Sequence, residues 1–214
     1  MRHFTKNTGI AALITANLFG LNAEAKEWAF DVYLDNSKIG LHTFKLDDHS
    51  ELTSKANFKV KVLFFNAYQY DHVAIERWQG DCLVNLESNT IEDEVIYKIK
   101  AARTLKYLNV NDGQKGRDLP LCSMTFAYWN PKILQQSHLL NPQNAEWLDT
   151  KVTKLGTENI DVKGQTIEAT HYKLDASLAG AKKLNIELWY TSENEWVALK
   201  SITANGNIIN YKLR

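Results

Sequence analysis

The sequence predicts a mainly β protein, a curved antiparallel sheet (half-barrel or barrel-like) of about ten to twelve strands with one short helix. Two observations support this prediction. After residue 25, apolar and polar residues alternate through most of the chain, which is the period of half-buried strands. Residues that favour turns separate the alternating runs at short intervals. An open sheet with so many strands is expected to curl, close or stack.

The strand signals follow one another along the chain in a meander. The first run alternates apolar Trp28, Phe30 and Val32 with mixed residues, and a turn at 35–38 leads to a partner strand. The Asn205-Gly206 pair is a strong signal for a two-residue hairpin. The expected strands cover 28–34, 39–46, 58–64, 68–78, 83–87, 94–100, 104–110, 146–155, 158–162, 165–174, 183–190, 196–204 and 207–213.

The one helix is expected at residues 131–138. Asn130 suits the N-cap and Pro131 suits the first helical position. Two roles are compatible with this placement. The helix either plugs the open side of the curved sheet with Trp129 as an anchor, or it forms a lid over an apolar cavity.

The N-terminus has the order of a secretory signal peptide. Arg2 and Lys6 precede an uncharged, largely apolar run over residues 9–21, and Ala23-Glu24-Ala25 offers a cleavage site. That run is shorter than the roughly 20 residues of a membrane-spanning helix. We therefore expect a signal peptide at 1–25, cleavage after Ala25, one β-rich domain at 26–214 and a periplasmic location. A buried N-terminal helix and a permanent anchor are the alternatives.

Cys82 and Cys122 are the two cysteines of the chain. In an oxidising compartment, two thiols in one small domain usually pair, so a structural disulfide is expected. Two free buried thiols or a redox pair are the alternatives, although the sequence has no Cys-x-x-Cys motif.

Composition excludes several classes of protein. The chain has 25 basic and 25 acidic residues and no long basic run, whereas a nucleic-acid binder needs clustered Lys and Arg. No integral membrane span is expected once the signal peptide is removed.

No motif in the sequence predicts catalysis, a metal site or a cofactor. The histidines lack the spacing of a metal site, and the nucleophile and phosphate-binding motifs are absent. Tyr70 and His72 share one strand face, whereas Asp71 lies on the other. We therefore expect no enzyme and no cofactor. An envelope enzyme would require His72, His138 or His171 to cluster with carboxylates.

Blocks of sequence resemble a family of exported proteins of unknown function from Gram-negative bacteria. The resemblance rests on residues 28–35, 39–40, 42–44, 78–83, 128–131, 139–143, 188–190 and 196–200, and on Gly206, Tyr211 and Leu213. That family is in turn distantly similar to periplasmic carriers of outer-membrane lipoproteins. This second resemblance implies a curved sheet around a short helix, with an apolar concave face for acyl chains. It implies no functional residues for this chain.

The many aromatic residues leave the nature of the interior open. Six Trp, nine Tyr and eight Phe suit a filled core or a cavity for an apolar ligand equally well. Our first hypothesis is a binding or carrier protein for a hydrophobic or lipid-like ligand. The residues expected on its concave face are Phe30, Val60, Val62, Trp129 and Leu188. The alternative is a structural or interaction module of the envelope with no small ligand. Ligand identity, protein partner and oligomeric state are not predicted.

Overall fold

The computed structural model describes residues 25–62, 65–203 and 205–214. The predicted signal peptide therefore lies outside the described residues, apart from Ala25. The described chain forms fourteen strands and one short 3₁₀ helix, η1. The elements are β1 Lys26–Leu34, β2 Ser37–Leu46, β3 Glu51–Val62, β4 Phe65–Gln79, β5 Cys82–Glu92, β6 Val95–Arg103, β7 Leu108–Asn111, β8 Gly116–Leu119, η1 Pro131–Gln135, β9 His138–Leu140, β10 Trp147–Val162, β11 Gln165–Leu178, β12 Ala181–Tyr190, β13 Trp196–Ile202 and β14 Ile208–Leu213.

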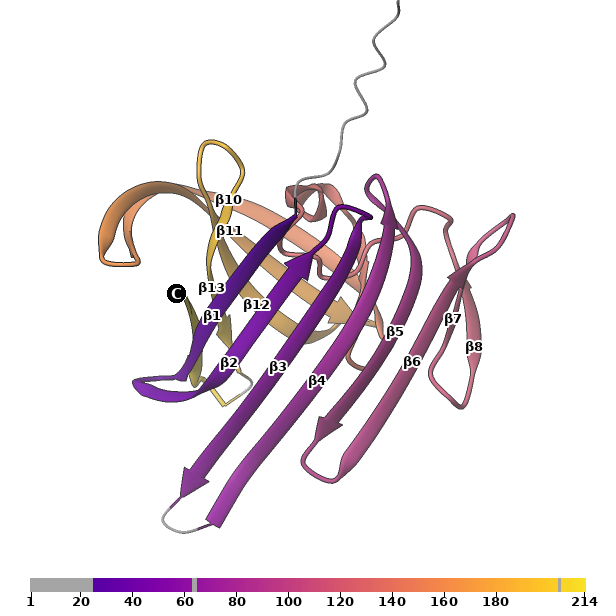
Figure 1. Cartoon of the computed structure of the whole chain (residues 1–214), viewed down its shortest axis with the longest axis horizontal. Helices are drawn as coiled ribbons and strands as arrows, with labels where there is room; N and C mark the ends of the chain where they lie inside the picture. Colours follow the sequence, from indigo (N-terminus) through magenta and orange to yellow (C-terminus); the bar gives the residue numbers. More distant parts are fainter. Residues whose placement is uncertain (1–24, 63–64, 204) are drawn as a thin grey trace, which may run out of the picture.

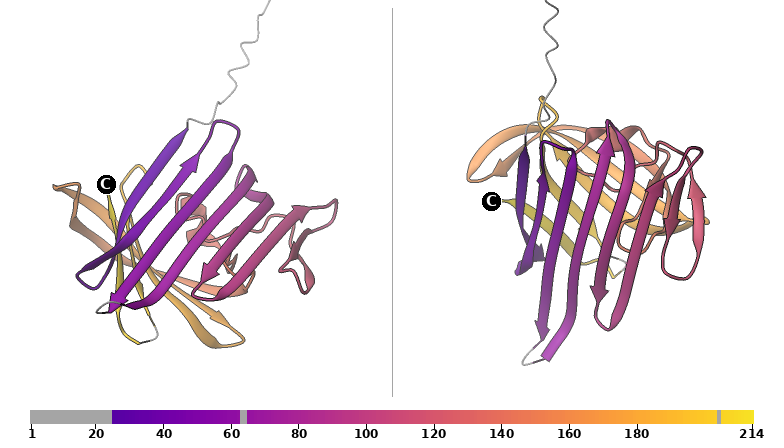
Figure 2. Two further views of the ribbon diagram at one scale, coloured as in Figure 1. Left: turned by 60° about the horizontal axis from the view of Figure 1, so that its bottom comes forward. Right: turned by 45° about the vertical axis from the view of Figure 1, so that its right-hand side comes forward.

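All fourteen strands belong to one antiparallel sheet. The strand order is β8-β7-β6-β5-β4-β3-β2-β1-β14-β13-β12-β11-β10-β9, so two meanders join where β1 pairs with β14. In the described part of the chain β8 and β9 are the two edges and do not pair with each other. The strands β1–β6 cover β10–β13 in Figure 1, and Figure 2 shows the same fold-back from two other sides. The predicted fold class, a curved antiparallel sheet in a mainly β protein, is confirmed.

The sequence prediction differs from the structure in the number of strands and in some of their bounds, as at β3, which begins at Glu51 instead of residue 58. The short strands β8 and β9 were not predicted. The expected strands 146–155 and 158–162 are one strand, β10, because a register shift between Lys154 and Gly156 lets the pairing with β11 continue. The described residues form fourteen strands, more than the expected ten to twelve.

The helix prediction is correct at its start and wrong at its end. The Asn130 side chain accepts a hydrogen bond from the Lys132 backbone N–H at 3.0 Å, and Pro131 begins the helix, as expected for this cap. The helix nevertheless ends at Gln135, because Gln136 is extended. His138 belongs to β9, which pairs with β10 instead of continuing the helix.

Residues 120–137, called the crossing segment here, connect the two edges of the sheet through its interior. The Leu83 N–H donates to the Ser123 carbonyl at 3.1 Å, which attaches the segment to β5. The Tyr190 hydroxyl donates to the Tyr128 carbonyl at 2.7 Å, which attaches it to β12. The segment therefore contacts both meanders and fills part of the space between them.

A disulfide joins Cys82, at the start of β5, to Cys122 in the crossing segment. Their Cα atoms lie 4.5 Å apart, a separation that a disulfide can bridge. The predicted disulfide is thus present in the structure. It anchors the crossing segment to the meander of β1–β8.

The main core surrounds the crossing segment. Met124 and Ile133 from that segment are fully buried, or nearly so, among large apolar residues of both meanders. Along β1, Trp28 and Phe30 face this core and Val32 faces a second, smaller cluster with Phe58 and Tyr70, while the residues between them are half-buried, as the alternation predicts. Within the described residues, no helix has the length and apolarity that crossing a membrane requires.

Candidate functional site

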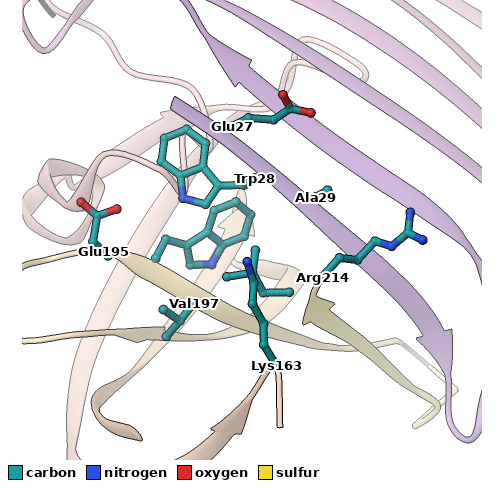
Figure 3. Close-up of a pocket in the computed structure, with 9 residues that line it drawn as sticks. Glu27, Trp28, Ala29, Lys163, Glu195, Val197 and Arg214 are labelled. Carbon is teal, nitrogen blue, oxygen red and sulfur yellow. The ribbon is translucent and has the colours of Figure 1, made fainter. Parts of the chain in front are cut away.

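A small pocket lies where β1, β13 and the end of β14 meet the turn after β10. It has a volume of about 420 Å³ and includes Trp28, Lys163 and Arg214 in its lining. Figure 3 shows Lys163 reaching toward Trp28 from the β10–β11 turn. The two tryptophans of this pocket, Trp28 and Trp196, are already buried in the core. Little apolar surface is therefore left there for a ligand.

A larger cavity of about 790 Å³ lies inside the curved sheet. Its volume falls in the range of about 300–1,000 Å³ that is typical of small-molecule sites. Three parts of the chain form most of its lining: the inner faces of β2–β4, strands β12–β14 with the β13–β14 turn, and the crossing segment with the turn after β9. Leu34 at the end of β1 and Glu92 at the end of β5 complete it. This cavity is the candidate functional site.

Small side chains on neighbouring strands make the room for the cavity. Ser54 on β3 pairs with Ala74 on β4, and both line the cavity. Ala74 also pairs with Ser88 on β5, whose hydroxyl donates to the Pro142 carbonyl at 2.6 Å and which does not line the cavity. Each of these side chains is buried. Because they are small, they project little from the concave face of the sheet. At the same level on β2, Phe44 is large and marks the end of these small side chains.

Aromatic side chains form the wall beside these small side chains. The Phe58 and Tyr70 rings stack with centroids 5.2 Å apart, and Tyr68 extends the stack at 6.5 Å from Tyr70. The Tyr211 ring from β14 meets the Phe58 ring edge-on at 6.3 Å. These rings offer a large apolar surface to a ligand.

Six buried polar side chains interrupt the apolar lining. Asn141 lies in the turn after β9, and the other five lie on β2–β4 and together are called the polar floor here: His42, Ser54, Tyr70, His72 and Glu76. Each is at most 7% exposed. Most polar groups with so little access to water are hydrogen bonded in folded proteins.

Hydrogen bonds hold His42 in place from two sides. Its Nε2 lies 2.8 Å from Ser54 Oγ, and its Nδ1 lies 3.2 Å from Tyr211 Oη. The imidazole also stacks on Phe44, with centroids 4.0 Å apart. Burial lowers the pKa of His42 well below 6.5, with a smaller contribution from His72. His42 is therefore neutral at pH 7.

His72 and Glu76 each form a side-chain hydrogen bond through one atom. His72 Nδ1 lies 2.8 Å from Thr90 Oγ1, and the Trp78 indole N–H donates to Glu76 Oε2 at 3.2 Å. Burial lowers the pKa of His72 to about 4 and raises the pKa of Glu76 to about 7. At neutral pH the His72 ring is uncharged and the Glu76 carboxyl is partly protonated.

The chemistry available to this arrangement is mainly hydrogen bonding. His42 and Ser54 form a contact of the kind that activates a nucleophile, but Nδ1 of His42 faces the Tyr211 hydroxyl and not a carboxylate. The lowered pKa of His42 also makes it a weak base. Among the described residues, no three His, Cys, Asp or Glu side chains form a group that could hold a metal ion.

The residues predicted for ligand binding lie in different surroundings. Val60 and Trp129 line the cavity. Phe30 and Leu188 are fully buried in the main core and are not among the lining residues, and Phe30 packs against Trp196 at 4.4 Å. The side chain of Val62 lies outside the described residues.

The sequence analysis noted that Tyr70 and His72 share a strand face, but it did not connect them with His42, Ser54 and Glu76 as one polar group. The signal was present, because Tyr70, His72 and Glu76 share the inward face of β4 with Ala74 and Trp78. Polar residues at inward positions of a strand predict either a hydrogen-bonded core or a site. The sequence does not reveal that small residues leave space beside them.

The other two histidines named in the sequence analysis lie on other strands, each with its own partners. His138 on β9 pairs with Asp149 at 2.9 Å. His171 on β11 lies between Glu158 and Glu187, at 3.1 Å from each. Neither His138 nor His171 lines the cavity, whereas His72 does.

The fold and the cavity together define an open, barrel-like β protein with a hollow interior. The chain belongs to the family described as "Domain of unknown function (DUF6134)", which matches residues 30–214. No curated protein matches the chain.

One solved structure is similar to this chain over most of its length. It is the crystal structure of a β-barrel-like protein of the domain of unknown function DUF1849 from Brucella abortus, with a TM-score of 0.63. The two chains are 10% identical, and the match covers 88% of this chain and 94% of that one. At such low identity the similarity supports the fold alone.

Proposed function

We propose that this protein is exported to the periplasm and binds a hydrophobic, lipid-like ligand in the cavity of the curved sheet. The observation that carries the proposal is the cavity of about 790 Å³ with its aromatic wall of Phe58, Tyr68, Tyr70 and Tyr211. Cavities of this size with mostly apolar walls and a few polar groups are the usual sites for small ligands. The similarity to lipoprotein carriers stays a prediction, and it suggests an acyl chain as the ligand.

Two features support export. Residues 1–25 have the composition of a signal peptide. The Cys82–Cys122 disulfide suits an oxidising compartment such as the periplasm. Both features agree with the family resemblance, and neither depends on the cavity.

A second candidate function is an interaction module of the envelope. The edges β8 and β9 have no strand partner on one side within the described sheet. Large apolar side chains are also exposed on the meander of β1–β8, with Leu105 98% and Ile96 59% exposed. Open edges and exposed apolar side chains suit contact with another protein.

Native mass spectrometry of the protein purified from the periplasm tests the proposal. We expect a chain that starts at Lys26, is two hydrogens lighter because of the disulfide, and carries a stoichiometric apolar adduct that organic extraction releases. A bare mass, with no binding when lipids are offered, contradicts ligand binding and favours the interaction module. A chain that keeps residues 1–25 contradicts export with cleavage.

A further inference from the structure

The polar floor has hydrogen-bonding capacity that the protein does not use. His72 is bonded through Nδ1 to Thr90, and Nε2 has no hydrogen-bond partner among the described residues. The buried hydroxyl of Tyr70 also lacks a partner within the described chain. Both residues line the cavity and are at least nine-tenths buried. A ligand atom that bonds to such a group gains more than it would in water.

The floor offers no positive charge to a ligand. Among the described lining residues, the charged or acidic side chains are Glu76, Glu92 and Lys183. Glu76 is buried, whereas Glu92 and Lys183 are exposed, and Lys183 forms an ion pair with Glu146 at 2.9 Å. A phosphate or carboxylate head group on the floor would therefore be buried without a cation, which is strongly unfavourable.

From these observations, and resting on the proposed function, we propose that the ligand is a single-chain amphiphile with an uncharged, hydrogen-bonding head group. A monoacylglycerol represents this class. The head group lies on the polar floor and bonds to His72, and its hydroxyl or ester oxygens are matched to the neutral donors and acceptors there.

The distribution of apolar residues in the cavity indicates the direction in which the acyl chain of the ligand extends. Leu34, Val60 and Ile209 line the cavity and are half-buried, so they lie nearer to water than the polar floor does. The acyl chain extends from the floor past the Phe58–Tyr70 stack toward these residues. The cavity volume of about 790 Å³ is in the range of sites for drug-sized ligands, which suits a ligand with a single acyl chain.

Competition between lipids that share one acyl chain tests the head-group preference. The protein is loaded with the apolar fluorophore N-phenyl-1-naphthylamine, which is then displaced by monopalmitoylglycerol, palmitoyl lysophosphatidylglycerol or palmitoyl lysophosphatidylcholine below their micelle concentrations. We expect monopalmitoylglycerol to displace the fluorophore at roughly tenfold lower concentration than either phospholipid.

Substitution of His72 tests whether the head group binds at the polar floor. In His72→Phe the affinity for monopalmitoylglycerol, taken relative to the affinity for the fluorophore in the same variant, is expected to fall about fivefold, the effect of one lost hydrogen bond. His72→Gln keeps a polar group and is expected to retain most of the preference. His138→Phe is the matched control, since His138 does not line the cavity, and should change neither affinity.

The outcomes separate this inference from the proposed function. Fluorophore binding with equal displacement by the three lipids, or with tighter binding of a phospholipid, overturns the uncharged head group and leaves an apolar site in place. Absence of fluorophore binding contradicts the proposed function itself. The lipid comparison uses the natural chain, so it stands even when a His72 variant does not fold.

Discussion

The interior of this sheet has two ends that are built from similar residues and packed differently. At the filled end, the crossing segment places Met124 and Ile133 against Leu83 and Leu140, and each of these side chains is at most 1% exposed. At the hollow end, the small side chains of Ser54 and Ala74 line the cavity. The difference shows that the same strand alternation supports a solid core or a binding cavity, depending on what covers the inner face.

The crossing segment belongs to both ends. Its disulfide and its backbone hydrogen bonds attach it to the filled end. Phe126, Ala127, Tyr128 and Trp129 then form one wall of the cavity. The filled end is therefore the support on which the hollow end depends.

Removal of the disulfide is expected to have the largest effect. The Cys82→Ser, Cys122→Ser double variant loses about 4 kcal/mol of unfolding free energy, because the bond closes a long loop in the unfolded chain. Urea denaturation of the oxidised natural chain and the variant measures this loss. Equal midpoints with equal slopes would show that the crossing segment is held by packing alone.

Substitution of Glu76, which lies at the hollow end, by Gln (Glu76→Gln) is expected to change how the unfolding free energy of the protein depends on pH. The pKa of Glu76 is raised from 4.5 to about 7 in the folded chain, so the folded state binds more protons between these values and loses stability as pH rises through that window. The variant lacks this loss. The unfolding free energy of the variant, measured relative to that of the natural chain, should therefore rise by about 3 kcal/mol between pH 4.5 and pH 8.

The comparison of the two chains removes the contribution of the histidines. The lowered pKa of His72 and His42 acts in the opposite direction, because the unfolded chain then binds more protons below about pH 6.5. Both chains share that contribution, so it cancels in the difference. Urea denaturation at several pH values measures it, and a difference that does not change with pH would contradict the raised pKa of Glu76.

Enlarging an alanine should distinguish the two ends directly. Ala74→Leu adds its side chain at the cavity and is expected to change the unfolding free energy by less than about 1 kcal/mol. Ala101→Leu adds the same atoms in the main core, where Ala101 is 2% exposed, and should cost about 2 kcal/mol. Thermal denaturation of both variants measures the contrast. Equal losses would mean that the hollow end has no spare room.

Much of the fold follows from local sequence patterns. The alternation in β1 and β4 identifies strands and their inward faces, and Asn130-Pro131 identifies the start of η1. The extents of β8 and β9 do not follow, because these strands have four and three residues and too little alternation to detect. Their formation depends on partners that are distant in the sequence.

The candidate site was only partly accessible to sequence reasoning. Alternation places Phe30, Val60 and Leu188 on inward faces without indicating which of them meet a cavity. Phe30 and Leu188 are covered by neighbours in the core, whereas Val60 lines the cavity. That difference arises from tertiary packing, above all from the path of residues 120–137, which no local pattern specifies.

A fluorescence titration of the natural chain and Ala74→Leu with N-phenyl-1-naphthylamine tests the central claim most directly. We predict saturable binding at one site in the natural chain and roughly tenfold weaker binding in the variant, with both proteins folded to the same extent. Equal affinity of the two proteins would place the apolar site outside the cavity and contradict this account.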